Sequence, residues 1–224
     1  MIIVIDGLSG SGKSSTAKAV AEKLGIQYLD SGALYRVATY IWLEADKDTE
    51  KFLEILPLKD IQFEYVDKDF IVHVDGVNVS NKIRKQKVSE HVSIVAALPE
   101  VRIFINKLMR KAVKDSNYIA DGRDLGSAVF PDADLKFFME ASLEVRAERR
   151  FKELRESDDS VTFGQVMENL LDRDSRDKSR KMDPLVKPED AYIIDTSEKT
   201  FDEQVIEICN IISEKVLINK NLEL

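Results

Sequence analysis

The segment Gly7–Ser14 constrains the fold of this chain more than any other. It reads Gly-Leu-Ser-Gly-Ser-Gly-Lys-Ser and matches the pattern G-x-x-x-x-G-K-[ST]. The apolar run Ile2–Ile5 before it predicts a strand buried on both faces, and Ser14–Leu24 after it carries apolar residues at helical spacing. A loop between such a strand and helix can direct backbone N–H groups and the helix dipole at one phosphate. We therefore predict a phosphate-binding loop, with a glycine-rich structural turn as the alternative.

The predicted loop offers several groups to the phosphates of a nucleotide. Lys13 can reach the β- and γ-phosphates, and a serine hydroxyl can serve magnesium or the α-phosphate. We assign magnesium to Ser14, with Ser15 as the alternative. The residues expected to contact the phosphates are Gly7, Leu8, Ser9, Gly10, Ser11, Gly12, Lys13, Ser14 and Ser15.

The rest of the chain alternates short apolar strands with helices, which predicts an α/β fold. The five expected strands are Ile2–Ile5, Gln27–Leu29, Tyr118–Asp121, Leu135–Met139 and Tyr192–Asp195. The expected helices cover about 14–24, 33–44, 99–113, 143–156, 163–180 and 201–216. This alternation implies one parallel sheet with helices on both faces.

One region, at about 45–91, departs from the alternation. Residues 61–66 and 70–74 alternate apolar and polar side chains, and Asp75-Gly76 leads into a third short strand. Tight turns join these strands, so we interpret the region as an inserted antiparallel β subdomain.

Composition excludes several classes of protein. The 33 basic and 41 acidic residues give a net charge of −8, which argues against nucleic acid as a partner. Cys209 is the only cysteine, so no intramolecular disulfide forms, and His73 and His91 cannot complete a zinc site with it at the usual spacings. No apolar run approaches the roughly 20 residues that span a bilayer. Asp6 interrupts the first apolar run too early for a signal peptide. We expect a cytosolic chain without a membrane partner.

Motifs beyond the loop narrow the use of the nucleotide. A G protein would carry Asn-Lys-x-Asp, which the sequence lacks. A motor or transporter ATPase is usually longer and shows an apolar strand that ends in Asp-Glu, whereas Tyr118–Asp121 is followed by Gly122. A small kinase remains, and it should direct several cations at a phosphate acceptor.

Those cations are present. Lys13, Arg36 and Arg123 follow three strands whose carboxyl ends share one edge of the sheet, where ligands of open parallel sheets bind. Arg173, Arg176 and Arg180 recur at spacings of three and four, which predicts one helix face. Arginine suits such a site because its planar fork binds phosphate through two bonds.

Each group of arginines also has a structural alternative. Arg146, Arg149 and Arg150 are predicted on a helix that also carries glutamates, so ordinary i,i+4 pairing is as plausible as a role in the site. The segment 173–180 mixes its arginines with aspartates, which is also typical of a solvated helix.

Together these segments resemble those of bacterial cytidylate kinases, within the nucleoside monophosphate kinases. The matching segments occur in the same order and are Gly7–Ser14, Leu29–Arg36, Val95–Arg102, Asp121–Gly126, Val129–Ala133, Arg173–Arg180 and Pro184–Val186. The resemblance implies a three-layer P-loop NTPase fold with a five-stranded parallel sheet, an inserted small antiparallel β subdomain and a helical lid. We accordingly expect a kinase core at 1–34 and 92–224, a lid at about 151–178, and an NMP-binding subdomain at 35–91.

The resemblance also implies a reaction and a set of roles. A monomer would use ATP and Mg²⁺ to phosphorylate CMP and dCMP to CDP and dCDP by in-line transfer. The acceptor phosphate would be held by Ser31, Arg36, Arg123 and Arg180. The cytosine would be read by Ser93, Arg102 and Asp124, and the ribose reached by Arg173 and Asp177. The catalytic set would be Lys13, Arg123, Arg150 and Arg180.

The chemistry of cytosine agrees with the base-reading roles. Its N4 amino group is a donor that suits Asp124, and its N3 and O2 acceptors suit Arg102. Uracil reverses the group at position 4 and protonates N3, and such mismatches cost a factor of roughly 10⁴ or more in comparable sites. Two alternatives stay open: a kinase for UMP or another small phosphate acceptor, and a non-catalytic ATP-binding regulatory module.

Overall fold

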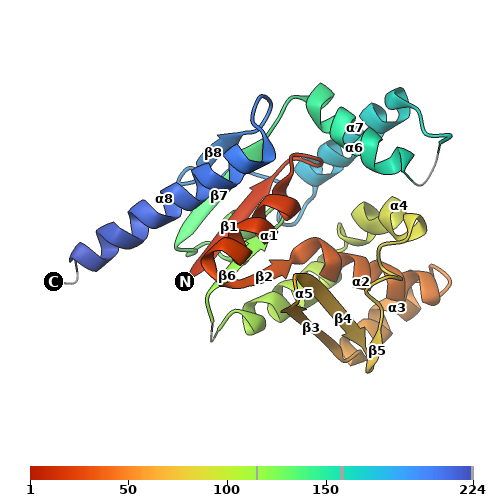
Figure 1. Cartoon of the computed structure of the whole chain (residues 1–224). Coiled ribbons are helices and arrows are strands. Elements are labelled where there is room, and N and C mark those ends of the chain that lie inside the picture. The colour runs from red at the N-terminus through yellow and green to blue at the C-terminus, as the bar shows by residue number, and fades with distance from the viewer. Residues whose placement is uncertain (115, 157–158, 223–224) are drawn as a thin grey trace.

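The computed structural model describes residues 1–114, 116–156 and 159–222 (Figure 1). A five-stranded sheet lies at its centre, in the order β2-β6-β1-β7-β8, and every neighbouring pair of strands is parallel. The strands are β1 (Ile2–Gly7), β2 (Gln27–Asp30), β6 (Tyr118–Asp121), β7 (Leu135–Glu140) and β8 (Tyr192–Asp195). The predicted five-stranded parallel sheet is confirmed, and its apolar central strand β1 is buried on both faces as expected.

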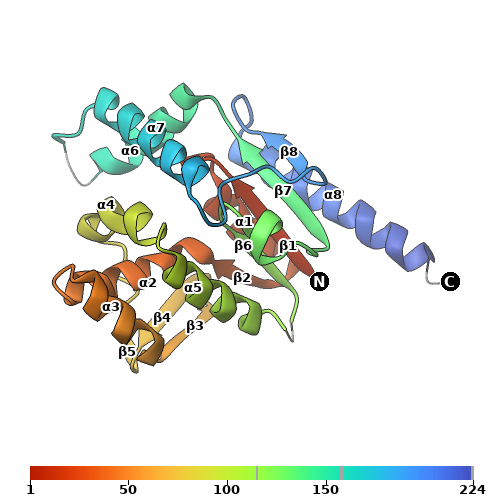
Figure 2. The same cartoon turned by 180° about the vertical axis from the view of Figure 1, so that it is seen from behind.

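Helices cover both faces of this sheet, as the two opposite views show (Figures 1 and 2). All the predicted helices occur with small shifts at their ends. They are α1 (Lys13–Leu24), α2 (Ser31–Glu44), α5 (Pro99–Ala112), α6 (Leu143–Arg155), α7 (Phe163–Ser179) and α8 (Phe201–Leu222). α2 begins two residues earlier than expected because the Asp30 side chain caps it, accepting a 2.8 Å hydrogen bond from the Ala33 N–H.

The inserted region contains the predicted antiparallel sheet, in the order β3-β4-β5. Its strands are β3 (Ile61–Val66), β4 (Asp69–Val74) and β5 (Val77–Asn78). It also contains two helices that the sequence analysis missed, α3 (Thr49–Ile55) and α4 (Gln86–Val95). α3 has Asp48 as its cap but is only seven residues long and buries only Phe52, and α4 has no side-chain cap, so each gives a weak helix signal in the sequence.

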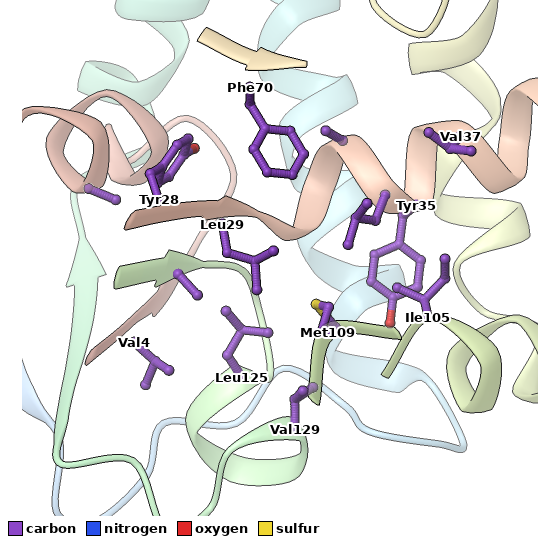
Figure 3. Packing of buried hydrophobic residues seen from close by; sticks show 14 of the residues in the cluster. Val4, Tyr28, Leu29, Tyr35, Val37, Phe70, Ile105, Met109, Leu125 and Val129 are labelled. Atoms are coloured by element: carbon purple, nitrogen blue, oxygen red, sulfur yellow. The ribbon is translucent and has the colours of Figure 1, made fainter. Parts of the chain in front are cut away.

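The small sheet packs on the edge of the large one through aromatic rings. Tyr28 on β2 meets Tyr65 and Phe70 edge-on, with ring centroids 5.4 and 6.2 Å apart. Figure 3 shows Phe70 next to Tyr28 and above Leu29, in a core that continues to Met109 and Val129. The inserted sheet therefore shares one hydrophobic core with the central sheet.

α6 and α7 form a hairpin that reaches beyond the sheet, across from α4 in both views (Figures 1 and 2). The hairpin has a small core of its own, made by Ala147, Val166 and Leu170. The lid predicted at about 151–178 spans this hairpin, except that residues 157 and 158 lie outside the described residues. Within the described part of the chain, none of the helices is long and apolar enough to cross a membrane.

Candidate active site

The glycine-rich loop lies between β1 and α1, at the carboxyl edge of the sheet, as predicted. Gly7 has φ +147°, and a Cβ atom there would lie 1.9 Å from the Met139 carbonyl oxygen on β7. Gly12 has φ +91° and caps the N-terminus of α1. Only glycine fits these two positions without strain, so the local sequence determines both how closely the loop approaches β7 and where the helix begins.

Lys13 is buried at the first position of α1. Its ammonium donates to the Leu8 carbonyl oxygen and lies 3.3 Å from the Ser11 hydroxyl. Burial and repulsion by Arg123 hold the pKa of Lys13 well below its ordinary value, and Asp121 opposes this shift. A nearby anion would favour the charged form of Lys13. The lowered pKa is therefore consistent with a phosphate that binds in the loop.

The hydroxyl of Ser14 donates a 2.6 Å hydrogen bond to Asp121, whose other carboxylate oxygen accepts from Tyr28 at 2.7 Å. Ser15 is exposed and donates instead to the backbone oxygen of Gly12. Burial, with repulsion by Asp30, raises the pKa of Asp121. A hydroxyl beside a carboxylate provides the oxygen ligands that Mg²⁺ prefers, so Ser14 and Asp121 fit the ion. Asp121 was missed as a site residue, although its place as the last residue of a buried strand was a usable signal.

Arg36, Arg123 and Arg173 come from α2, the end of β6 and α7, and they lie close enough to repel one another. Burial and the charges of Arg123 and Arg36 lower the pKa of Arg173 to about 9. Burial also lowers the pKa of Arg36. Among the described residues, the buried Nε atoms of Arg173 and Arg180 have no hydrogen-bond partner. An anion with several oxygens would relieve both the repulsion and the unsatisfied donors.

The predicted base-reading residues Arg102 and Asp124 form an ion pair in the interior. The Arg102 side chain is fully buried and lies against the Tyr35 ring, 5.3 Å from its centroid. Asp124 also accepts a 3.1 Å hydrogen bond from Arg180 Nη2. Burial raises the pKa of Asp124, although both arginines oppose the shift. Ser93, the third predicted base contact, lies half-buried on α4.

Asp177 and Ser31 join the same region. The Asp177 carboxylate accepts from Arg123 Nε at 3.1 Å and lies 3.6 Å from Arg180 Nη1. The Ser31 hydroxyl donates to the backbone oxygen of Asp121 at 2.6 Å. Ion pairs thus join five of the predicted residues into one connected set: Arg102, Arg123, Asp124, Asp177 and Arg180.

One expectation about the arginines differs from the structure. α7 ends at Ser179, so Arg180 has an extended backbone, and Arg176 turns to solvent beside Asp172. The expectation that Arg173, Arg176 and Arg180 share one face is therefore wrong. Arg150 pairs with Glu153 on its own helix at 2.8 Å, and its side chain is 40% exposed.

Four residues to which the sequence analysis gave no role in the site support the glycine-rich loop from neighbouring elements: Arg146, Arg149, Asp174 and Thr196. Arg146 on α6 donates to the Ser9 carbonyl oxygen at 2.9 Å and to Asp174 at 2.6 Å. Arg149 donates to the hydroxyl and the carbonyl oxygen of Thr196, and the Thr196 hydroxyl in turn donates to the Ser11 carbonyl oxygen at 3.2 Å. The i,i+4 pairing considered for these two arginines is wrong, because their partners lie far away in the sequence.

Comparison with known proteins identifies the family of this chain. The family model for cytidylate kinase matches residues 3–214. The chain belongs to the cytidylate kinase family. It is 43% identical over 208 residues to the cytidylate kinase of Caldanaerobacter subterraneus subsp. tengcongensis, covering 92% of this chain and 91% of that protein. It is 42% identical over 211 residues to that of Clostridioides difficile, covering 93% and 96%.

A solved structure of an uncharacterized protein from Eubacterium ventriosum shares the fold with a TM-score of 0.55 and 14% sequence identity. It covers 95% of this chain and 98% of its own. Membership of the cytidylate kinase family makes this chain a nucleoside monophosphate kinase, as the resemblance implied. The interpretation as a non-catalytic regulatory module is not favoured.

Proposed function

We propose that this chain phosphorylates CMP and dCMP with ATP and Mg²⁺, and that the residues described above perform the transfer. The observation that carries the proposal is the crowding of Arg36, Arg123 and Arg173 beside the glycine-rich loop. Among the residues that the structure describes, the buried Nε donors of Arg173 and Arg180 also lack partners. Such a cluster of cations favours a second polyanion next to the one in the loop. A switch or motor protein has no use for that second site.

On the donor side, the backbone from Gly7 to Ser15 would surround the phosphates of ATP, and Lys13 would bridge to the transferred group. Ser14, backed by Asp121, would hold the magnesium ion. When bound, the metal neutralises charge that develops on the phosphates. Arg146 and Asp174 would keep the loop in place around Ser9.

On the acceptor side, Arg36, Arg123 and Arg180 would hold the monophosphate in line, with the Ser31 hydroxyl beside them and Arg173 reaching the ribose. Two polyanions repel strongly unless cations lie between them. These arginines would therefore align the acceptor phosphate and also neutralise its charge. No general base is required, because the acceptor phosphate is largely ionised at neutral pH. Asp177 would orient Arg123 as well as approach the ribose.

The base would lie against the pair formed by Arg102 and Asp124. The carboxylate would accept from the N4 amino group, and the guanidinium would donate to N3 and O2. Ser93, on α4, would complete the contacts. Uracil would present an acceptor to the carboxylate and a donor to the guanidinium, which leaves buried polar groups unpaired.

We further propose that the α6–α7 hairpin, within about 151–178, closes over ATP as a lid, and that residues 35–91 form the NMP-binding subdomain. Closure would bring Arg150 from its exposed pair with Glu153 onto the transferring phosphoryl group. It would also exclude water that would otherwise hydrolyse ATP. The enzyme is expected to work as a monomer in the cytosol, which sedimentation and fractionation would test.

A panel of acceptors with labelled ATP tests the function directly. We expect CDP and dCDP as products, with CMP and dCMP far ahead of UMP and AMP in kcat/KM. Preference for UMP would overturn the base-reading roles. Arg180→Ala, compared with the matched exposed control Arg176→Ala, tests the acceptor site. We expect the first variant to lose at least about 100-fold in kcat/KM for CMP and the second to keep wild-type activity.

A further inference from the structure

Asp183 is a carboxylate to which the resemblance gave no role, and it lies inside the base-reading group. It follows α7 with φ +48°, a left-handed conformation that aspartate tolerates better than most residues. Its Oδ2 atom accepts hydrogen bonds from Arg102 Nε at 2.9 Å and from Asn106 Nδ2 at 3.0 Å, and its backbone oxygen accepts from Arg180 Nη2 at 2.8 Å. One residue thus connects α5 with the segment that carries Arg180.

The contacts of Asp183 decide which donors of Arg102 remain free. The Nε atom bonds Asp183, one terminal nitrogen bonds Asp124, and the other bonds the Ala96 carbonyl oxygen at 3.3 Å. A guanidinium has five N–H groups, so one N–H is left on each terminal nitrogen. Two remaining donors on one planar guanidinium match the number of acceptors, N3 and O2, that cytosine presents.

Asp183 also completes a closed ring of supports behind Arg102. The Tyr35 hydroxyl donates to Asn106 Oδ1 at 3.1 Å, Asn106 donates to Asp183, and Asp183 accepts from Arg102, which lies over the Tyr35 ring. Each member restricts the next, so the guanidinium is held in one plane before any substrate arrives. Such preorganisation improves recognition without touching the substrate.

The charges give a second reason for this carboxylate. Without Asp183, the buried Arg102 would depend on Asp124 alone, and it shares that carboxylate with Arg180. Asp183 forms a second ion pair with Arg102 through the Nε atom of that arginine. The Asp183 side chain is 17% exposed, whereas the Arg102 side chain is fully buried. Asp124 then accepts one hydrogen bond from each arginine, and each of its oxygens keeps a lone pair for the base.

We propose that Asp183 is a positioning residue for acceptor recognition. Asp183 holds Arg102 in position. The selection of CMP over UMP therefore depends on Asp183, whereas the phosphoryl transfer step does not. This inference rests on the proposed function, since it presupposes that Arg102 faces the base.

Steady-state kinetics of Asp183→Asn and Asp183→Ala test it, with CMP and UMP as acceptors. We expect KM for CMP to rise about tenfold or more, and the CMP-to-UMP ratio of kcat/KM to fall by a similar factor. We expect KM for ATP and kcat at saturating CMP to stay within about threefold of wild type, because the groups around the phosphates are unchanged. Asp172→Asn, an exposed aspartate on α7, is the matched control and should change nothing.

A double-mutant cycle separates positioning from general damage. In an Arg102→Ala background, Asp183→Asn should have little further effect on the CMP-to-UMP ratio, because both changes remove the same interaction. Asn106→Ala, which leaves the carboxylate in place and removes one support, should shift the ratio in the same direction by less. If the Asp183 variants do not fold, the CMP-to-UMP ratio of Asn106→Ala tests the proposal on its own.

The proposal is overturned if the wild type prefers CMP and the Asp183 variants keep that preference within twofold, or if KM for ATP rises as much as KM for CMP. A wild type that does not prefer CMP would instead overturn the proposed function, and this inference with it.

Discussion

The carboxylate of Asp174, on α7, accepts a 3.0 Å hydrogen bond from the backbone N–H of Ser9 in the glycine-rich loop. The same carboxylate bonds Arg146, which in turn donates to the Ser9 carbonyl oxygen. The backbone N–H of Ser9 is therefore held by α7, and its backbone carbonyl is held by α6. All three residues are buried or nearly so, which makes this contact strong and costly to break.

Asp174→Ala should destabilise the protein and disturb ATP binding together. It leaves the Arg146 guanidinium buried without its carboxylate, which costs about 3–5 kcal/mol in comparable pairs. Because the loop loses its support at Ser9, kcat/KM for ATP should fall by roughly 10- to 100-fold. Calorimetric unfolding and initial rates at varied ATP measure the two effects. Asp172→Ala is the matched control, and ATP kinetics unchanged in Asp174→Ala would show that the contact is only structural.

Arg173→Met should stabilise the free protein and inactivate it. The arginine is repelled by Arg123 and Arg36, and its Nε donor is buried without a partner, so an apolar side chain of similar length removes two unfavourable terms. We expect Tm to rise by roughly 2–4 °C, which is about 1 kcal/mol for a chain of this size. Activity with CMP should fall by at least about 100-fold. Arg176→Met is the exposed control. If the Tm of Arg173→Met is lower than that of Arg176→Met, Arg173 does not destabilise the free protein.

Ser14→Ala and Ser15→Ala form a matched pair for the metal site. Ser14 faces Asp121, and Ser15 faces solvent and the backbone of Gly12. We expect Ser14→Ala to raise the magnesium concentration needed for half-maximal rate by roughly 10-fold or more, and Ser15→Ala to leave it near the wild-type value. Rates measured over a magnesium titration distinguish them. Equal effects of the two changes would remove Ser14 from its proposed role.

Asp6 should make stability depend on pH. Its carboxylate accepts from the N–H groups of Leu125 and Gly126, yet burial raises its pKa from 3.8 to about 7. Between these values the folded protein binds a proton that the unfolded chain does not, so this group's contribution to stability falls as pH rises from about 4 to 7. Unfolding of the wild type and Asp6→Asn across pH 4–8 tests this. The difference in unfolding free energy should change by up to about 1.4 kcal/mol per pH unit, and a constant difference would contradict the shift.

The sequence predicted those parts of the molecule whose cause is local. The glycine-rich loop, the apolar strands and the arginines at strand ends are each specified by neighbouring residues, and they lie where expected. Arg123 and Arg36 were identifiable because a strand end fixes the edge on which a residue lies.

Residues whose role comes from distant partners were not predictable in this way. Arg146 and Asp174 are ordinary charges on solvated helices until the hairpin folds back onto Ser9. Asp183 stands in an irregular segment, and its position depends on a left-handed turn that no pattern announced. α4 has three buried valines and no side-chain cap, so tertiary packing rather than propensity makes it a helix.

Arg173 and Asp174 are consecutive on α7, one directed at the acceptor arginines and the other at the loop around Ser9. Successive residues of an α-helix differ by 1.5 Å in rise and about 100° in direction. In the proposed function, a single helical step would therefore relate the side chain that faces the acceptor phosphate to the one that supports the loop around ATP. One residue added to or removed from α7 at this point would therefore turn one of the two side chains away from its partners.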